Sequence, residues 1–279
     1  MEKRSLHFFQ HVTAPTLSGD LDAVFWRVTV LQICHREPAV RHAVLAVRHT
    51  VLAVSSLHEG LLQGSVDPYV GDAGPRESFA LRQYNKAIAC LLDRMNDPTS
   101  QPVGPLLTCV LFVCIEFVQS KDKESLIHLE QGRQILARLE RRADSRDADI
   151  EVIKQHLVPM YTRLSMTSFL FGGTPVPIPQ SLKTARETPA TFESLREMRY
   201  TLHDFFDEVL RFTQRSRPAK YSSSMAPEAL EGFALEQDRL LRQLATLSVA
   251  SSLFQASRPN EASDITYAVL QVYLRIATI

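Results

Sequence analysis

Residues 105–119 read PLLTCVLFVCIEFVQ, a segment in which Glu116 is the only charged side chain. Apolar residues fall on every face when this segment is wound as a helix, and such a helix is stable only when other elements surround it. The apolar run from Leu106 to Val118 spans about 13 residues, fewer than the roughly 20 that a bilayer requires. The segment therefore predicts the central helix of a bundle, with Glu116 either at its rim or buried beside a partner.

Amphipathic helices are predicted on both sides of this segment. From Ser78 to Met95 the apolar residues recur at steps of three and four, which places them on one helix face. Strand signals are weak, because the sequence has no Asn-Gly or Asp-Gly turn and no sustained alternation. The fold class is therefore predicted as all-α, an irregular bundle of about 8–10 helices. Further helices are expected near 123–142, 150–171, 193–215, 228–256 and 262–278.

Breaks in this pattern suggest where loops lie. Loops are predicted at 64–75, 172–191 and 215–227, which are rich in proline, glycine or serine. Pro159 is expected to kink or divide the helix at 150–171. The chain is predicted to be mostly one domain over 1–279, with a possible soft boundary at 172–191. The predicted core consists of Phe25, Trp26, Val44, Leu52, Tyr84, Ile88, Leu107, Leu111, Phe112, Ile115, Leu129, Leu136, Leu164 and Phe205.

A tandem repeat lies near the N-terminus, where AVRHAVL (39–45) is followed by AVRHTVL (46–52). Seven residues make nearly two helical turns, so the copy lengthens one helix without turning its apolar face. The repeat spaces His35, His42 and His49 about 10.5 Å apart along the axis, too far for one metal ion. Glu37 and Arg41 are expected to form an i,i+4 ion pair.

The charge balance limits the classes of partner. Lys+Arg and Asp+Glu are both 31, so the formal net charge is zero. Direct binding to nucleic acid by this chain is not expected, because phosphate contacts need an excess of cations, and neither is a membrane anchor. The four cysteines (34, 90, 109 and 114) have no C-x2-C spacing and are expected to be reduced, mostly buried thiols of an intracellular protein.

The segment HDFFDE (203–208) is the best candidate for chemistry. Asp204, Asp207 and Glu208 share one helix face, and a D-x-x-D pair can chelate magnesium and diphosphate, as in all-helical terpene synthases. The second ligand motif of those enzymes is missing here, so we interpret the acids as a solvated face and Phe205 and Phe206 as core residues.

Other charged groups have similarly plain interpretations. His58–Glu59 lacks the second histidine of a zinc protease motif. A basic cluster alternates with acids and is interpreted as a mixed-charge helix end and loop; it comprises Arg133, Arg138, Arg141, Arg142 and Arg146, with Glu140, Asp144, Asp147 and Asp149. No catalytic, cofactor-binding or metal-ligating residue is assigned, and no cofactor or enzymatic activity is expected.

Four long blocks in order resemble the regulatory domain of fungal zinc binuclear-cluster transcription factors. They run from RSLHFFQHV to SSLHE (4–59), ALRQYNKAIACLL (80–92), GPLLTCVLFVCIEFVQS to QGRQIL (104–136) and HLVPMYTRLSMTSFLFG (156–172). The resemblance implies a helical module that tunes transcription through intramolecular, partner or ligand contacts. It also implies a nuclear protein that is often encoded in a secondary-metabolite gene cluster.

The sequence also departs from that family pattern. The six-cysteine cluster that holds two zinc ions and reads DNA is not found in these residues. The domain of the family usually extends past the position of Ile279, so a C-terminally shortened copy is expected. We therefore expect a regulator or co-regulator that works through protein partners, among them a full-length relative. The alternatives are a helical enzyme or small-ligand binder of secondary metabolism, and a non-functional remnant of a longer regulator.

Overall fold

The computed structural model describes residues 6–18, 23–47, 75–97, 100–139, 148–170, 173–183, 188–221, 227–262 and 264–277. Within these ranges all regular elements are helices and none is a strand, which confirms the predicted all-α class. Several predictions lie outside the described residues: the second repeat beyond 47, the loop at 64–74, Leu52, His49 and the pair His58–Glu59.

Contacts along the chain define two compact units, Met1–Leu157 and Val158–Ile279. The soft boundary expected at 172–191 therefore lies inside the second unit. Helical residues run without a break from 148 to 170, through α8 (Ala148–Val152), the π-helical turn η4 (Ile153–Leu157) and α9 (Val158–Leu170). Pro159 does not divide this segment. It follows a π-helical turn, where the regular hydrogen-bond ladder is already altered and a missing N–H is tolerated.

The first unit is built around α6 (Val103–Val118), the central helix predicted from the sequence. It packs against α7 (Asp122–Arg138) and α5 (Pro75–Asn96), both close to their predicted bounds. The α6–α7 connection is tight because Ser120 adopts a left-handed conformation with φ 57°. Lys121 N–H then donates to Glu116 O (2.9 Å) and Ser120 N–H to Phe117 O (3.0 Å), which satisfies the last carbonyls of α6.

The N-terminal part of this unit consists of short helical pieces, η1 (Phe9–Thr13), α2 (Ala14–Ser18), η2 (Phe25–Thr29) and α3 (Val30–Arg36), followed by helical residues 38–47. Helix α3 ends at Arg36 because Glu37 precedes Pro38 and takes an extended conformation. The predicted Glu37–Arg41 pair is wrong. Glu37 is buried and pairs with Arg94 of α5 at 3.2 Å, while Arg41 donates to Cys34 O and His35 O, each at 3.1 Å.

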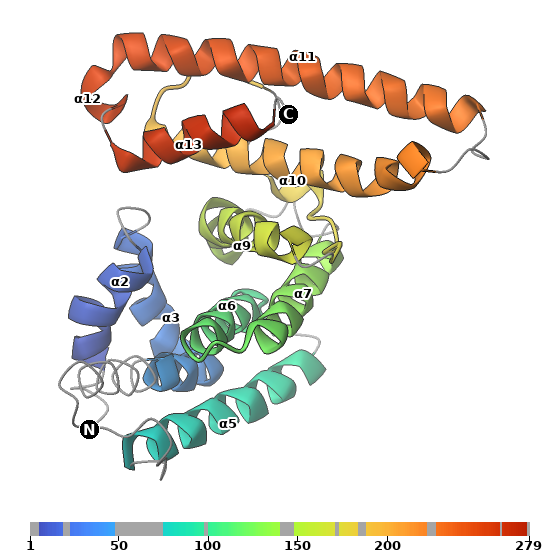
Figure 1. Ribbon diagram of the computed structural model, residues 1–279. Helices are drawn as coiled ribbons and strands as arrows, with labels where there is room; N and C mark the ends of the chain where they lie inside the picture. The colour runs from blue at the N-terminus through green and yellow to red at the C-terminus, as the bar shows by residue number, and fades with distance from the viewer. Residues whose placement is uncertain are drawn as a thin grey trace, which may run out of the picture. The chain divides into compact units, whose positions relative to one another are not determined.

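The second unit contains α9 and the long helices α10 (Leu195–Tyr221) and α11 (Pro227–Ser257), followed by α12 (Pro259–Ala262) and α13 (Ile265–Ile276). Figure 1 shows α10 running alongside α11, with α13 packed against α10. Helix α10 continues through Pro218 to Tyr221, so the loop predicted from 215 is wrong for its first seven residues. An ion pair at 2.6 Å between Arg215 and Glu236 of α11 holds this extension.

The predicted core is largely correct. Ten of its members are buried: Phe25, Trp26, Val44, Leu107, Leu111, Phe112, Ile115, Leu129, Leu136 and Phe205. Tyr84, Ile88 and Leu164 are half-buried. The second unit has its own core between α10, α11 and α13, which consists of Phe192, Met198, Leu202, Phe205, Leu240, Leu244, Leu247, Ala250, Phe254, Tyr267, Leu270 and Leu274.

Candidate functional site

The HDFFDE segment lies in the middle of α10, where its phenylalanines face the core and its acids face polar and charged groups of neighbouring segments. Phe205 and Phe206 are buried, as predicted. The interpretation of a solvated acidic face is wrong for two of the three acids. Asp207 is 3% exposed and the side chain of Asp204 is 19% exposed, whereas that of Glu208 is 40% exposed. The two aspartates are covered because cationic side chains pack over them.

Asp207 holds the loop at 173–183 against α10 through Arg211. Arg211 Nε lies 2.9 Å from Asp207 Oδ2 and Arg211 Nη2 lies 3.3 Å from Asp207 Oδ1, a bidentate pair. The same guanidinium donates to the carbonyls of Pro175 (2.5 Å) and Val176 (3.5 Å). Since both carboxylate oxygens and much of the guanidinium are engaged, this pair is a structural clamp.

Asp204 faces the other end of the same loop. Lys183 Nζ lies 3.3 Å from Asp204 Oδ1, and the Thr162 hydroxyl donates to that oxygen at 3.3 Å. Burial raises the pKa of Asp204 above its ordinary value; Lys183 opposes this rise, and the neighbouring Asp207 adds to it. The charge of Asp204 is therefore only partly compensated within the protein.

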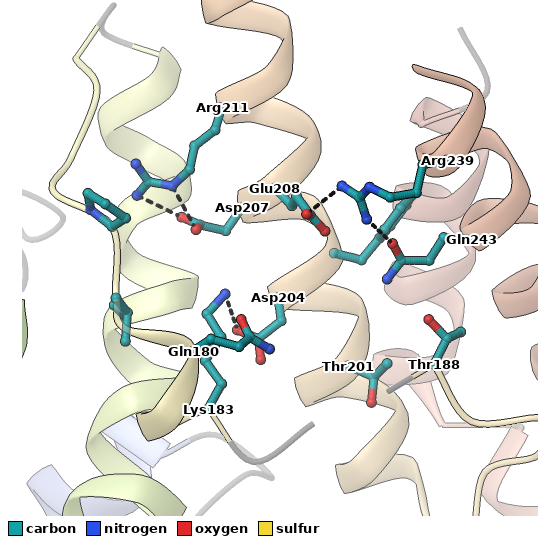
Figure 2. Close-up of a pocket in the computed structure, with 13 residues that line it drawn as sticks. Gln180, Lys183, Thr188, Thr201, Asp204, Asp207, Glu208, Arg211, Arg239 and Gln243 are labelled. Atoms are coloured by element: carbon teal, nitrogen blue, oxygen red, sulfur yellow. Dashed lines mark hydrogen bonds and ion pairs between the residues drawn. The ribbon is translucent and has the colours of Figure 1, made fainter. Parts of the chain in front are cut away.

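Glu208 faces α11. Arg239 Nη2 lies 2.6 Å from Glu208 Oε1, and Arg239 Nη1 donates to Gln243 Oε1 at 3.3 Å. Figure 2 shows the result: acids from α10 lie in the middle, with Lys183 on one side and Arg239 on the other.

These groups line a cleft of about 700 Å³, here called the α10 cleft. Its walls are the loop residues 177–183 on one side and α11 with the nearby Thr188 on the other, and α10 forms its floor. The lining residues are Pro177, Ile178, Gln180, Lys183, Thr188, Thr201, Asp204, Phe205, Asp207, Glu208, Arg211, Arg239 and Gln243. A cleft of this size is in the range that binds small molecules.

The arrangement does not favour magnesium chemistry at the D-x-x-D pair. Each aspartate already contacts a protein cation, which a metal ion would have to displace. Among the described residues, no group of three or more His, Cys, Asp or Glu side chains is placed to hold a metal ion.

A second polar cluster lies in the first unit, around Glu116. The Tyr84 hydroxyl donates to Glu116 Oε1 at 2.6 Å, His128 Nε2 lies 3.0 Å from that hydroxyl, and Lys121 Nζ lies 3.7 Å from Glu116 Oε2. Glu116 is thus a partnered buried acid, one of the two states expected for it. Burial raises the pKa of Tyr84 and lowers that of His128. Phe112 packs on both rings, so the cluster is part of the core.

The remaining candidates are dispersed over the structure. His42 Nδ1 lies 2.8 Å from Gln83 Oε1, and Asp149 pairs with Arg36 at 2.6 Å. None of the four cysteines, all of which are described, forms a disulfide; Cys34 and Cys109 are buried, and Cys90 and Cys114 are half-buried. Arg133 is 0% exposed, so its predicted place in a mixed-charge helix end is wrong, and the members of that cluster at 140–147 lie outside the described residues. The spacing of Arg133 from Leu129 and Leu136 puts it on the inward face of α7, a signal present in the sequence.

Sequence reasoning missed the cationic half of the α10 cleft. Lys183 comes from a segment predicted only as loop, and Arg211 and Arg239 carried no motif. The one available signal was the i,i+4 spacing of Asp207 and Arg211, which predicts an ion pair on one helix.

The model of the fungal specific transcription factor domain matches residues 4–267, and the chain belongs to that family. Neither the curated proteins nor the solved structures contain a match to the chain. In the described part of the chain, no helix combines the length and the apolar character needed to span a bilayer.

Proposed function

We propose that this chain is a nuclear transcription regulator of a secondary-metabolite gene cluster that acts by binding other proteins. Membership in the transcription factor domain family supports the regulatory role and favours a non-enzymatic one. The same membership supports the nuclear location. The link to secondary metabolism is supported by the sequence resemblance described above.

The charges of the chain support contacts with protein rather than with DNA. The 31 basic and 31 acidic residues cancel. Arg36, Arg94, Arg211 and Arg239 all pair with carboxylates within the chain. Guanidinium groups engaged in this way contribute little to phosphate binding, which depends on released counterions and free cations.

The observation that carries the proposal is a pair of apolar rows on the second unit. The outer row of α11 comprises Leu241, Ala245, Val249 and Leu253, and its three large side chains are 51, 59 and 47% exposed. It lies opposite the buried face of α11, which contains Leu240, Leu244 and Leu247.

The outer row of α13 comprises Val269, Val272 and Ile276, which are 46, 54 and 55% exposed. Single exposed apolar residues are ordinary, but rows at helical spacing are typical of helix faces that dock on a partner. We take the partner to be a full-length transcription factor of the same family, whose DNA-binding cluster supplies the contact with the promoter.

The test uses the purified chain and an immobilised full-length family member from the same fungus. Replacing Leu241 and Val249 together by Ser is expected to weaken binding about tenfold or more, because central apolar anchors dominate such interfaces. Leu81→Ser is the matched control, since Leu81 is 60% exposed on α5 of the first unit. Equal binding by the wild type, the double variant and Leu81→Ser would contradict the proposal that the outer row of α11 contacts the partner.

Direct DNA binding is tested separately with a labelled promoter fragment. The chain alone is expected to bind weakly at physiological salt, and the full-length partner is expected to recruit it to the fragment. Tight binding by the chain alone, with a steep loss on adding salt, would contradict the proposal. Deleting the gene is expected to change transcript levels of the adjacent biosynthetic genes.

A further inference from the structure

The α10 cleft contains polar groups that the described residues leave unsatisfied. Thr201 is 5% exposed and lines the cleft, and within the described ranges its hydroxyl makes no hydrogen bond. Thr188, near α11 (Figure 2), is half-buried, and no described residue forms a hydrogen bond with its hydroxyl. These hydroxyl oxygens are open to the cleft, so a polar group bound there can form a hydrogen bond with them.

The acids on the floor of the cleft also have spare capacity. Asp204 accepts through Oδ1 and Glu208 through Oε1. No described residue donates to Asp204 Oδ2 or to Glu208 Oε2. The two residues are four apart on α10, so their side chains lie about 5–6 Å apart on one face. An ammonium group, which has three donors, is suited to bridge two such carboxylates.

A cationic side chain lies on each side of the α10 cleft, Lys183 on the loop side and Arg239 on the α11 side. The side chain of Lys183 is 10% exposed, and in the described part of the chain its ammonium has Asp204 as its one ion-pair partner, although it carries three donors. Arg239 approaches Glu208 from the opposite wall (Figure 2). A carboxylate bound in the cleft could therefore accept hydrogen bonds from either side.

The charges that line the cleft favour a ligand without net charge. Among the described lining residues, the Asp207–Arg211 pair compensates itself, and the charges of Lys183 and Arg239 balance those of Asp204 and Glu208. A ligand with a net charge would leave one of these groups uncompensated in a partly buried site. Pro177, Ile178 and Phe205 add an apolar part to the lining, where an apolar side group can pack.

We propose that the α10 cleft binds a small zwitterion with an apolar side group, an amino acid or a dipeptide. Asp204 and Glu208 bind its ammonium group, Lys183 or Arg239 binds its carboxylate, and Thr201 donates to or accepts from its polar backbone. The raised pKa of Asp204 agrees with this, because a ligand ammonium supplies the compensation that the protein lacks.

The test is isothermal titration calorimetry on the full chain. The probes are L-leucine, L-leucyl-L-leucine, N-acetyl-L-leucine, L-leucinamide and glucose. One or both zwitterions are expected to bind, and the acetylated and amidated forms at least about tenfold more weakly, because each leaves a charged protein group unpaired. Whether leucine or the dipeptide binds more tightly distinguishes the two sizes of ligand.

Variants locate the binding site. Asp204→Asn and Thr201→Val are expected to weaken binding of the better zwitterion about tenfold or more. Glu231→Gln, an exposed acid on α11 that does not line the cleft, is the matched control and is expected to bind normally. Glu208→Gln serves as a second cleft variant if Asp204→Asn does not fold, since the Glu208 side chain is 40% exposed.

Three results would overturn the proposal: no heat from either zwitterion at millimolar concentration, equal binding of N-acetyl-L-leucine, or binding that the cleft variants leave unchanged. Binding of glucose in place of the zwitterions would assign the cleft to neutral polyols instead. The titration contains no protein partner, so its failure would leave the proposed protein contacts untouched.

Discussion

Helices α6 and α11 use their apolar residues in opposite ways. Thirteen of the 16 residues of α6 are buried, and its one acid is held by Tyr84 and Lys121. Helix α11 has 31 residues, of which six are buried along one narrow face, and it exposes a second apolar row on the opposite side. Because burial contributes to stability only where partners are present, α6 stabilises its unit, while the outer row of α11 is available for binding.

The largest change in the free energy of unfolding is expected from truncating Phe112, a side chain of α6 that packs against the polar cluster around Glu116. Phe112 is 0% exposed and its ring lies 4.7 Å from that of Tyr84 and 4.9 Å from that of His128. Phe112→Ala is expected to lower the free energy of unfolding by about 3–5 kcal/mol, measured by urea denaturation. Leu253→Ala, on the outer row of α11, should change it by less than about 0.5 kcal/mol. Similar losses in the two variants would remove the contrast.

The second unit is expected to lose stability in acid through His203. Burial, with Arg163 and Arg199 nearby, lowers the pKa of His203 from 6.5 to about 3. In the unfolded chain His203 therefore binds a proton below about pH 6.5, whereas in the folded chain it stays neutral until about pH 3. This one group should lower the free energy of unfolding by up to about 1.4 kcal/mol per pH unit in that window.

The measurement compares wild type with His203→Gln by thermal or urea unfolding between pH 7 and pH 4. The variant should show the shallower loss of stability on acidification. Parallel curves for the two proteins would show that His203 is not the buried neutral group described here.

Removing one hydroxyl tests the polar cluster on α6. Tyr84→Phe leaves Glu116, which is 4% exposed, without its shortest hydrogen bond. The expected loss is about 1–2 kcal/mol, because a buried charged acceptor is left short of a donor. Tyr200→Phe removes an exposed hydrogen bond from Arg196 and should cost little. Equal costs would mean that the Glu116 cluster is solvated.

The smallest effect is expected at the turn between α6 and α7. Ser120 has φ 57°, a conformation that costs a residue with a Cβ atom about 1 kcal/mol. Ser120→Gly relieves this strain but makes the unfolded chain more flexible, so a net gain of about 0.5 kcal/mol is expected. Differential scanning calorimetry should show a slightly higher midpoint, whereas a lower one would mean that the Ser120 side chain stabilises the turn.

The sequence predicted helices well and charge pairs poorly, for a physical reason. The apolar stretch at 105–119 and the periodic segment from Ser78 to Met95 specify their helices locally, because the hydrophobic pattern repeats within each segment. An ion pair between distant segments has no such local signal. Glu37 was expected to pair with Arg41 on its own helix but pairs with Arg94, 57 residues away.

The α10 cleft shows the same limit. Its acids were noticed in HDFFDE because they lie together in the sequence. Lys183 and Arg239, which pair with these acids, come from a loop and from another helix. The sequence gives no local signal for such pairs, so the acids looked like a solvated face although they lie in a cleft. The inward position of Arg133 could have been found, since it shares its helical spacing with Leu129 and Leu136.

The outer rows of α11 and α13 are the proposed contact surfaces of the chain. Hydrogen–deuterium exchange of the chain, measured with and without a saturating full-length family member, tests this most directly. We predict slower exchange at residues 241–253 and 269–276 in the complex, with α5 and α6 unchanged. Protection confined to the first unit, or none on either row when the partner is bound, would contradict the account.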